Sequence, residues 1–254
     1  MLLFFGMQIN AEDFGKVTVI IPTFNRFECL LNAVSSVLNQ TYENIEIIVV
    51  NDCSTDERYY THDFGKEVKV VHKETNSKKI YGFGSASPQR NAGIREADPS
   101  SKYIAFLDDD DSWLPHKLQL QINAMNQTGC KMSSTEALSG YGVYQPSQSY
   151  PLYNAEHCYK TILSIFKRKH STLLDNGFPK IWDAAFLSVH NCIITSSVVI
   201  RKDITQLVGE FKLMPYAEDF NYWKRALQHT DCVYVDVPCI YYDNGHGGGS
   251  NWGH

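Results

Sequence analysis

The sequence of 254 residues lacks the cysteine spacing of small disulfide-bonded or zinc-binding folds. Its seven cysteines are odd in number and include no CxxC pair, which argues against a disulfide framework and against a zinc ribbon. An apolar run of about 18 residues, as a membrane-spanning helix requires, is also absent. The apolar residues 1–6 are too few for a signal peptide and include no basic residue. These absences predict a cytoplasmic protein with buried thiols, and they leave peripheral contact with a membrane open.

An excess of positive charge is missing as well. The formal net charge is −5, so a general nucleic-acid binder is not expected, because affinity for phosphate backbones comes largely from Lys and Arg. What is present is the composition of a globular protein, with 43% hydrophobic and 20% charged residues. A chain of this length can bury the core of one large domain, and it contains no internal repeat.

Apolar strands and amphipathic helices alternate in the first half of the chain. The predicted strands are residues 17–22, 45–50, 68–72 and 103–107, and the predicted helices are 27–39 and 89–97. This alternation predicts an α/β fold with a mostly parallel sheet and helices on both faces.

The second half is less regular. We predict helices at 115–127, 155–169 and 217–227, a long loop or hairpin at 133–153, a strand at 189–200 interrupted by 195–197, and short strands at 233–237 and 240–242.

The most unusual stretch joins an apolar strand to four consecutive carboxylates, Asp108 to Asp111. Two such charges about 4 Å apart repel by roughly 1 kcal/mol even in water, and by more where solvent is scarce. A hard divalent cation such as Mg²⁺ or Mn²⁺ among their oxygens would remove that repulsion. The alternative is a solvated acidic turn in which Asp111 or Ser112 caps the next helix.

Two further polar motifs follow predicted strands. Residues 23–26 come after the first strand and residues 51–54 come after the second, as the Asp run comes after the fourth. In open parallel sheets, ligands bind beyond the carboxyl ends of the strands. The three motifs are therefore expected to converge on one site.

Five short motifs, in their order along the chain, resemble the family 2 glycosyltransferases. They are residues 20–26 (IIPTFNR), 49–56 (VVNDCSTD), 89–94 (QRNAGI), 106–111 (FLDDDD) and 218–225 (EDFNYWKR). The resemblance implies an inverting enzyme of the Rossmann-like GT-A fold, with a smaller mixed C-terminal part that holds the acceptor. It also implies a nucleotide-sugar donor, with a UDP-sugar favoured because a carboxylate can accept the N3–H of uracil.

The resemblance assigns donor binding mainly to the first half of the chain. The implied donor-binding residues are Thr23, Phe24, Asn25, Arg26, Asp52, Arg90, Asp108 and Asp109. Asp52 matches the aspartate that bonds the base, with an Asx-turn as the alternative, although Cys53 stands where the family often has glycine. Arg90 matches a basic residue near the base and the diphosphate, and its alternative is an ordinary surface charge.

The same resemblance implies a metal ligand and a catalytic base. Asp110 is expected to bind Mn²⁺ or Mg²⁺, and the extra aspartate of the run leaves the register open by one residue. His246, between glycines, is a second candidate metal ligand. Asp219 matches the general base that accepts the proton of the acceptor hydroxyl. Its alternative role is to place negative charge, with Glu218, at the start of a helix.

The acceptor is a glycan, a lipid-linked molecule or a protein, and the sequence does not distinguish among them. We expect one domain over residues 1–254, with residues 17–112 as the nucleotide-sugar half and residues 113–254 as the acceptor half. Trp182 and Asp183 are candidates to border the acceptor pocket.

Three other functions compete with this interpretation. They are a Mg²⁺-dependent phosphatase, a nucleotidyltransferase and a non-catalytic nucleotide-sugar-binding relative. The phosphatase would need a second downstream acidic motif, and the nucleotidyltransferase would need a basic glycine-rich loop near residues 23–26; neither is present. The intact Asp run and the pair Glu218-Asp219 argue against a non-catalytic relative.

Overall fold

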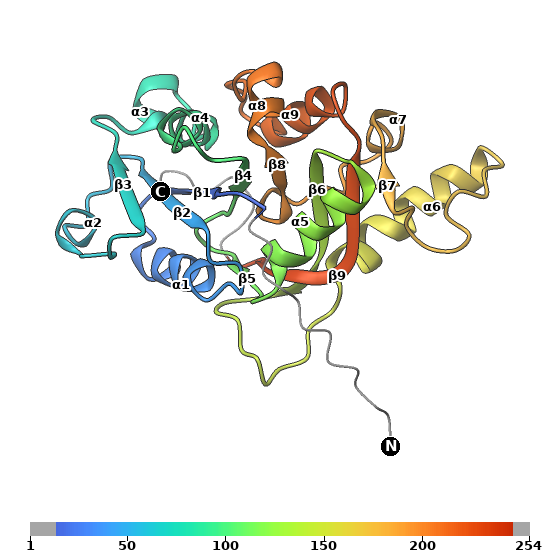
Figure 1. Ribbon diagram of the computed structural model, residues 1–254, viewed down its shortest axis with the longest axis horizontal. Coiled ribbons are helices and arrows are strands. Elements are labelled where there is room, and N and C mark those ends of the chain that lie inside the picture. The colour runs from blue at the N-terminus through green and yellow to red at the C-terminus, as the bar shows by residue number, and fades with distance from the viewer. Residues whose placement is uncertain (1–13, 246–254) are drawn as a thin grey trace.

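The computed structural model describes residues 14–245, which build one mixed β-sheet with helices on both faces (Figure 1). The strands are β1 Val17–Thr23, β2 Ile45–Asn51, β3 Val68–His72, β4 Tyr103–Phe106, β5 Ser112–Trp113, β6 Met132–Gly140, β7 Ile181–Trp182, β8 Val199–Arg201 and β9 Cys232–Asp243. The helices are α1 Phe27–Leu38, α2 Arg58–Thr61, α3 Ser77–Tyr81, α4 Ser87–Glu96, α5 Lys117–Thr128, α6 Tyr159–Arg168, α7 Ala184–Leu187, α8 Lys202–Val208 and α9 Glu218–Ala226. A π-helical turn, η1 Asn154–Cys158, and a 3₁₀ turn, η2 Thr195–Ser197, complete the described elements. Within residues 14–245, no helix has the length and apolarity to cross a bilayer.

The parallel half of the sheet is formed by β3, β2, β1 and β4, in that order. Alternate side chains of the buried strand β1 face opposite helical layers, as the period of two requires. Val17, Val19 and Ile21 belong to the apolar cluster that includes residues of α1 and α5, whereas Ile20 belongs to the cluster of α4, α8 and α9. The predicted α/β fold is confirmed, with the parallel strands in the half of the sheet that begins at the β3 edge.

The other half of the sheet is mixed, as expected. The order continues β8-β6-β9-β5 beyond β4, and β7 pairs with β9 off this path. β8 is antiparallel to both β4 and β6, β6 is parallel to β9, and β5 and β7 are antiparallel to β9. Strands from both predicted halves of the chain therefore share one sheet, and the division at residue 112 stays a prediction.

The segment 133–153, predicted as a loop or hairpin, contains the strand β6 in its first third, and Leu152 returns to form an antiparallel bridge with Leu138, as in a hairpin. The serines and threonine of β6 are fully buried, because hydrogen bonds satisfy their hydroxyls. Ser134 bonds Ser197 across 2.8 Å, and Ser133 accepts a bond of 3.0 Å from Gln121. Because the sequence of β6 is polar, it does not indicate a strand in the interior of the sheet.

Two other strand predictions need correction. In the segment 189–200, only the final residues belong to a strand, β8, because a 3₁₀ turn occupies 195–197. The two short strands predicted at 233–237 and 240–242 are one continuous strand, β9. An irregularity in its pairing with β6 lies beside Glu136, which explains the apparent break.

Helix α4 packs unusually close to β1 at Gly93. A Cβ atom at this position would lie 2.4 Å from Cγ2 of Ile20, closer than real side chains approach. Glycine therefore sets the distance between this helix and the sheet. Arg90 lies one helical turn earlier, so this close packing also fixes where its guanidinium reaches.

Helix α5 buries a lysine. The side chain of Lys117 has no exposed surface, its Nζ donates to Gln121 Oε1 at 2.7 Å, and it lies 4.0 Å from the ring centroid of Trp113. Burial lowers the pKa of Lys117 to about 7, because desolvation disfavours the charged form.

This buried lysine predicts a pH dependence of stability. Its pKa is about 7 in the folded state, against 10.5 when unperturbed, so between these values the unfolded state binds more protons. The contribution of Lys117 to the free energy of unfolding therefore increases as pH rises across that interval. Lys117→Met should make the rise shallower, as measured by urea unfolding at pH values of about 7 and about 9.5. An unchanged slope would contradict the shifted pKa.

Candidate active site

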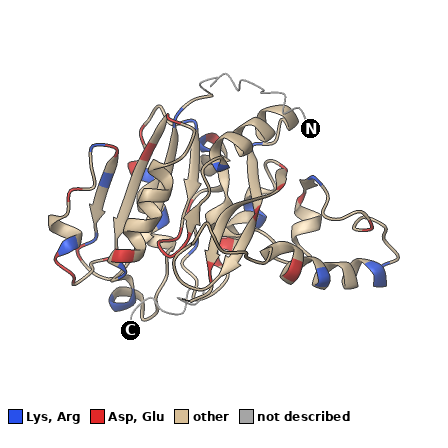
Figure 2. Ribbon diagram, turned by 90° about the horizontal axis from the view of Figure 1, so that it is seen from below, with Lys and Arg blue, Asp and Glu red and all other residues tan. Residues whose placement is uncertain are grey.

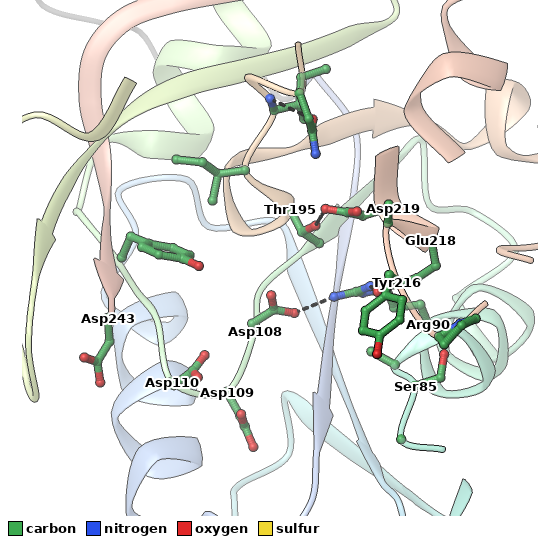
Figure 3. A pocket seen from close by; sticks show the side chains of 18 of the residues that line it. Ser85, Arg90, Asp108, Asp109, Asp110, Thr195, Tyr216, Glu218, Asp219 and Asp243 are labelled. Atoms are coloured by element: carbon green, nitrogen blue, oxygen red, sulfur yellow. Dashed lines mark hydrogen bonds and ion pairs between the residues drawn. The ribbon is translucent and has the colours of Figure 1, made fainter. Parts of the chain in front are cut away.

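A pocket of about 340 Å³ opens beyond the carboxyl ends of β1 and β4, beside the boundary between the parallel and mixed halves of the sheet. Segments that are distant in the sequence line it: the Asp run, the N-terminal part of α4, the residues before η2, the start of α9 and the end of β9 (Figure 3). The sequence-predicted residues among its lining are Arg26, Arg90, Asp108, Asp109, Asp110 and Asp219.

Arg90 connects two sides of the pocket. Its Nη2 donates to Asp108 Oδ1 at 2.8 Å and its Nη1 donates to Glu218 Oε1 at 3.0 Å, while the side chain is only 5% exposed. Burial opposes the charge, but the carboxylates of Asp108 and Glu218 more than offset this effect and raise the pKa of Arg90. A guanidinium held charged in this way is suited to an anionic ligand.

Asp109 and Asp110 share a second arginine. Arg26 Nη1 donates to Asp110 Oδ2 at 2.7 Å and lies 3.3 Å from Asp109 Oδ1. Asp109 also accepts a bond of 2.7 Å from the buried hydroxyl of Thr23. Burial and the charge of Asp110 raise the pKa of Asp109 to about 7. The loop after β1 is thereby joined to the Asp run.

Asp111 differs from the rest of the run because it points into the protein. Its carboxylate is 1% exposed and accepts bonds from Ser196 Oγ and, at 3.0 Å, from the backbone N–H of Asp243. Burial raises its pKa well above the ordinary range. Asp111 therefore links the run to η2 and β9, and the other three aspartates line the pocket.

Asp219 lies in the first turn of α9. Its Oδ2 accepts a bond of 3.2 Å from Thr195 Oγ1, and its Oδ1 accepts one of 2.6 Å from the backbone N–H of Phe220. Burial and the neighbouring Glu218 raise the pKa of Asp219, although Arg90 acts in the opposite direction. Ala217, just before the helix, has a left-handed backbone with φ of 53°. That conformation is strained by roughly 1 kcal/mol or more, and such strain is common at functional sites.

The remaining predicted residues of the β1 loop do not line this pocket. Asn25 is exposed and left-handed, with φ of 51°. Its side-chain oxygen accepts from the backbone of Thr55 at 2.9 Å, and its own N–H donates to Ser54 at 2.9 Å. Phe24 is half-buried beside it. The loop is held against the turn after β2, which gives Asn25 a local structural role.

Asp52 is buried away from the pocket, with 1% of its surface exposed. Its carboxylate accepts bonds from Asn76 Nδ2 at 3.0 Å and from the N–H and Oγ of Ser77 at 3.0 and 2.9 Å. Burial raises its pKa, while the bonds from Ser77 act in the opposite direction. Both oxygens are thus engaged by the start of α3, and recognition of a base by Asp52 stays a prediction.

Sequence reasoning missed several residues of the pocket. They are Tyr153, Thr195, Tyr216, Tyr242 and Asp243, together with the loops at 84–86 and 191–194. Of these, only Thr195 had a signal in the sequence, as the polar interruption of an expected strand. Tyr216 is 81% exposed at the rim, where an aromatic face is available to a ligand (Figure 3).

Trp182 and Asp183 have structural roles here, and a place for them at the acceptor pocket stays a prediction. Trp182 is fully buried and stacks on Tyr234 with ring centroids 4.3 Å apart, and Asp183 caps α7 by accepting from Phe186 N at 2.7 Å. Neither residue lines the pocket. His246 lies outside the described residues.

Among residues 14–245, no group of three or more His, Cys, Asp or Glu side chains is arranged to hold a metal ion. The pocket does present Asp108 and Asp110, each bonded to an arginine. Mg²⁺ commonly takes one or two carboxylates and fills its other positions with water and substrate phosphates. The side chains therefore fit an ion that binds together with a diphosphate, and they do not fit a cage made of protein ligands alone.

An α/β sheet with a charged pocket at the carboxyl ends of its parallel strands is typical of enzymes that bind nucleotide-type ligands. Comparison with known families identifies the chain more closely. The family described as Glycosyl transferase family 2 matches residues 18–204, most of the chain. The chain belongs to this family, which confirms the resemblance found in its motifs.

Individual relatives agree with this assignment. An uncharacterized glycosyltransferase of Rickettsia prowazekii is 31% identical over 87% of this chain and 61% of its own length. The UDP-Glc:alpha-D-GlcNAc-diphosphoundecaprenol beta-1,3-glucosyltransferase WfgD of Escherichia coli is 37% identical over 43% of this chain and 40% of its own length.

Among solved structures, residues 1–349 of S. aureus TarS in complex with UDP-GlcNAc superpose with a TM-score of 0.63 at 17% identity. The match covers 94% of this chain and 61% of that one, and it confirms the GT-A fold. This chain thus spans less than two thirds of the length of each relative and structure compared.

Proposed function

We propose that this protein is a glycosyltransferase that moves a sugar from a nucleotide sugar, with a UDP-sugar favoured, to an acceptor hydroxyl with inversion at the anomeric carbon. The observation that carries the proposal is one pocket lined both by Asp219 and by the charged cluster of Arg90, Asp108 and Asp110. The name of the E. coli relative, which includes UDP-Glc as donor, supports a UDP-sugar. So does the UDP-GlcNAc bound to the structurally similar TarS.

In the proposed reaction, Asp219 accepts the proton of the acceptor hydroxyl. The hydroxyl oxygen attacks the anomeric carbon from the face opposite the diphosphate, and a new C–O bond forms. The bond from the anomeric carbon to the phosphate oxygen breaks, and its electron pair leaves with the nucleoside diphosphate. Burial supports this role, because the raised pKa makes Asp219 a stronger base than an exposed aspartate. Thr195 orients the carboxylate through its hydrogen bond.

The leaving diphosphate is proposed to bind at the arginines and the Asp run. Arg90 and Arg26 offer guanidinium groups with the fork geometry that suits phosphate oxygens. A Mn²⁺ or Mg²⁺ ion at Asp110 would supply further neutralisation of the leaving group. Asp108 supports Asp110 from the end of β4, and Asp109 with Thr23 forms the side toward the ribose. His246 is retained as a proposed metal ligand.

Binding of the nucleoside is proposed on the β1 loop and the turn after β2. Phe24 and Asn25 would flank the base or ribose, and Asp52 would bond the base only after giving up part of its contact with Asn76 or Ser77. The acceptor would enter on the side of the pocket formed by the C-terminal half of the chain.

Titration with UDP and GDP, each with and without Mn²⁺, is the direct test of the donor site. We expect UDP to bind more tightly than GDP and Mn²⁺ to strengthen both interactions, as measured by isothermal titration calorimetry. Equal affinity for the two nucleotides would refute the preference for UDP. The absence of any effect of Mn²⁺ would refute the metal site.

The variant Asp110→Ala tests the metal ligand itself. We expect it to reduce the Mn²⁺-dependent gain in UDP affinity by about 10- to 100-fold, the scale on which perturbing a metal site acts. Asp236→Ala is the matched control, because Asp236 is an exposed aspartate of β9 outside the pocket. A normal response to Mn²⁺ in the Asp110 variant would show that Asp110 does not bind the metal.

A further inference from the structure

The segment 159–181, here called the basic arm, differs in charge from the rest of the protein. It contains five Lys or Arg residues and one acidic residue, Asp175, so its formal charge is +4 in a chain of −5. The arm consists of α6, the irregular residues after it and the first residue of β7. It lies at the outer end of the molecule, on the side away from β3 (Figure 1).

The cations of the arm are exposed. Lys160 and Lys167 are seven residues apart, about two turns of α6, and therefore lie on the same side of the helix, with Arg168 about a quarter of a turn away. The opposite side packs on the core through Ile162 and Phe166. Figure 2 shows blue segments of ribbon at this end of the molecule, which mark the Lys and Arg positions.

None of the arm's cations forms an ion pair within residues 14–245; they are Lys160, Lys167, Arg168, Lys169 and Lys180. Elsewhere in the structure, lysines and arginines such as Lys69 and Arg95 pair with carboxylates of the same chain. The positive charge of the arm is thus uncompensated and directed to the outside.

Apolar side chains accompany these cations. Leu173 is 48% exposed and Ile181 is 37% exposed, and Ile165 on α6 is half-buried without belonging to either apolar core cluster. Basic residues and exposed apolar residues in one segment are the two signals that together hold a protein at the surface of an anionic bilayer. A soluble polyanion would use the cations and leave the apolar residues in water.

We propose that the basic arm docks this enzyme on the surface of an anionic lipid membrane. The acidic remainder of the chain, with a net charge of −9 by difference from the same counts, is repelled from such a surface. The arm therefore sets the orientation, with α6 against the lipid and the rest of the protein directed away. This inference does not depend on the proposed donor, base or metal, because vesicle binding requires none of them.

Sedimentation with lipid vesicles tests the proposal. We expect the wild-type protein to bind vesicles that contain phosphatidylglycerol, to bind those of phosphatidylcholine alone much more weakly, and to be released by high salt. The triple variant Lys160→Glu, Lys167→Glu, Arg168→Glu should bind the anionic vesicles about 100-fold more weakly, since each basic residue contributes about fivefold.

A second triple variant serves as the matched control, because it changes the net charge by the same amount outside the basic arm. Lys66→Glu, Lys69→Glu and Lys131→Glu alter three exposed cations outside the arm, two of them at the β3 edge, and should leave vesicle binding within about twofold of the wild type. Equal loss in both triple variants would show a general charge effect and overturn the docking site.

A second set of variants separates docking from folding. Lys160→Gln, Lys167→Gln and Arg168→Gln keep residues of good helix propensity, and should still weaken vesicle binding about 100-fold, by the same contribution of each residue, at an unchanged thermal midpoint. Leu173→Asn should weaken it several-fold without a change of charge. Wild-type protein that binds heparin but not anionic vesicles, or arm variants that bind vesicles normally, would refute the proposal.

Discussion

Asp219→Asn is expected to abolish sugar transfer and to leave donor binding intact. Asparagine keeps the shape: its oxygen can accept from the backbone N–H of Phe220, as Asp219 Oδ1 does at 2.6 Å, and its NH2 group can donate to Thr195 Oγ1, which now bonds Asp219 Oδ2 at 3.2 Å. It cannot take up a proton. Loss of a positioned general base lowers turnover by about 10²- to 10⁴-fold. The measurement is the rate of nucleoside diphosphate release in the presence of acceptor, together with the calorimetric affinity for UDP.

The pH profile provides an independent readout of the same group. Because burial raises the pKa of Asp219, turnover of the wild type should fall as pH decreases through a value above the usual range of an aspartate. In Asp219→Asn this acidic limb should disappear from the residual activity. Asp203→Asn is the matched control, since Asp203 also lies in the first turn of a helix but outside the pocket. Wild-type turnover in Asp219→Asn would remove this residue from the mechanism.

Arg90→Met is expected to have the second largest effect, on both stability and activity. The substitution leaves Asp108, Glu218 and Asp219 close together without the guanidinium that now compensates them. Removing one member of a buried ionic network destabilises a protein by about 3 kcal/mol. Urea unfolding measures this loss, and UDP affinity should fall with it because a proposed phosphate contact is gone.

Arg95→Met is the control on the same helix. Arg95 pairs with Glu210 at 2.6 Å, but the two side chains are 57% and 69% exposed, so solvent screens the pair. Its loss should change the free energy of unfolding by about 0.5 kcal/mol or less. Similar destabilisation by both substitutions would show that Arg90 contributes only helix packing and surface charge.

The parallel half of the fold was predictable because each strand there is a short apolar run between polar turns. β3 begins and ends at the predicted residues, and β1 and β2 are one residue longer than predicted. In the mixed half, buried polar side chains of the strands form hydrogen bonds with residues that are distant in the sequence. Ser133 and Ser134 in β6 depend on partners at positions 121 and 197, and no local pattern reveals such pairing.

The sequence predicted the site residues that directly follow strands or belong to the recognised motifs. It did not predict the residues that distant segments bring to the pocket. Arg90 and Asp108 come from motifs beside the sheet, and the structure pairs them. Asp111 points away from the rest of its run because it bonds Ser196 and the backbone N–H of Asp243. Asp243 lies 132 residues from Asp111 in the sequence. Likewise, the contacts that occupy Asp52 come from α3, a helix too short to give a periodic signal.

The pairing of both pocket arginines with carboxylates has a thermodynamic consequence. A diphosphate that binds Arg26 and Arg90 competes with Asp108, Asp110 and Glu218 for the guanidinium groups, and it adds negative charge beside those carboxylates. A cation that binds the carboxylates alone competes with the same arginines. The pocket therefore accepts an anion and a cation together more readily than either one, so donor and metal should bind cooperatively, each raising the affinity of the other by the same factor.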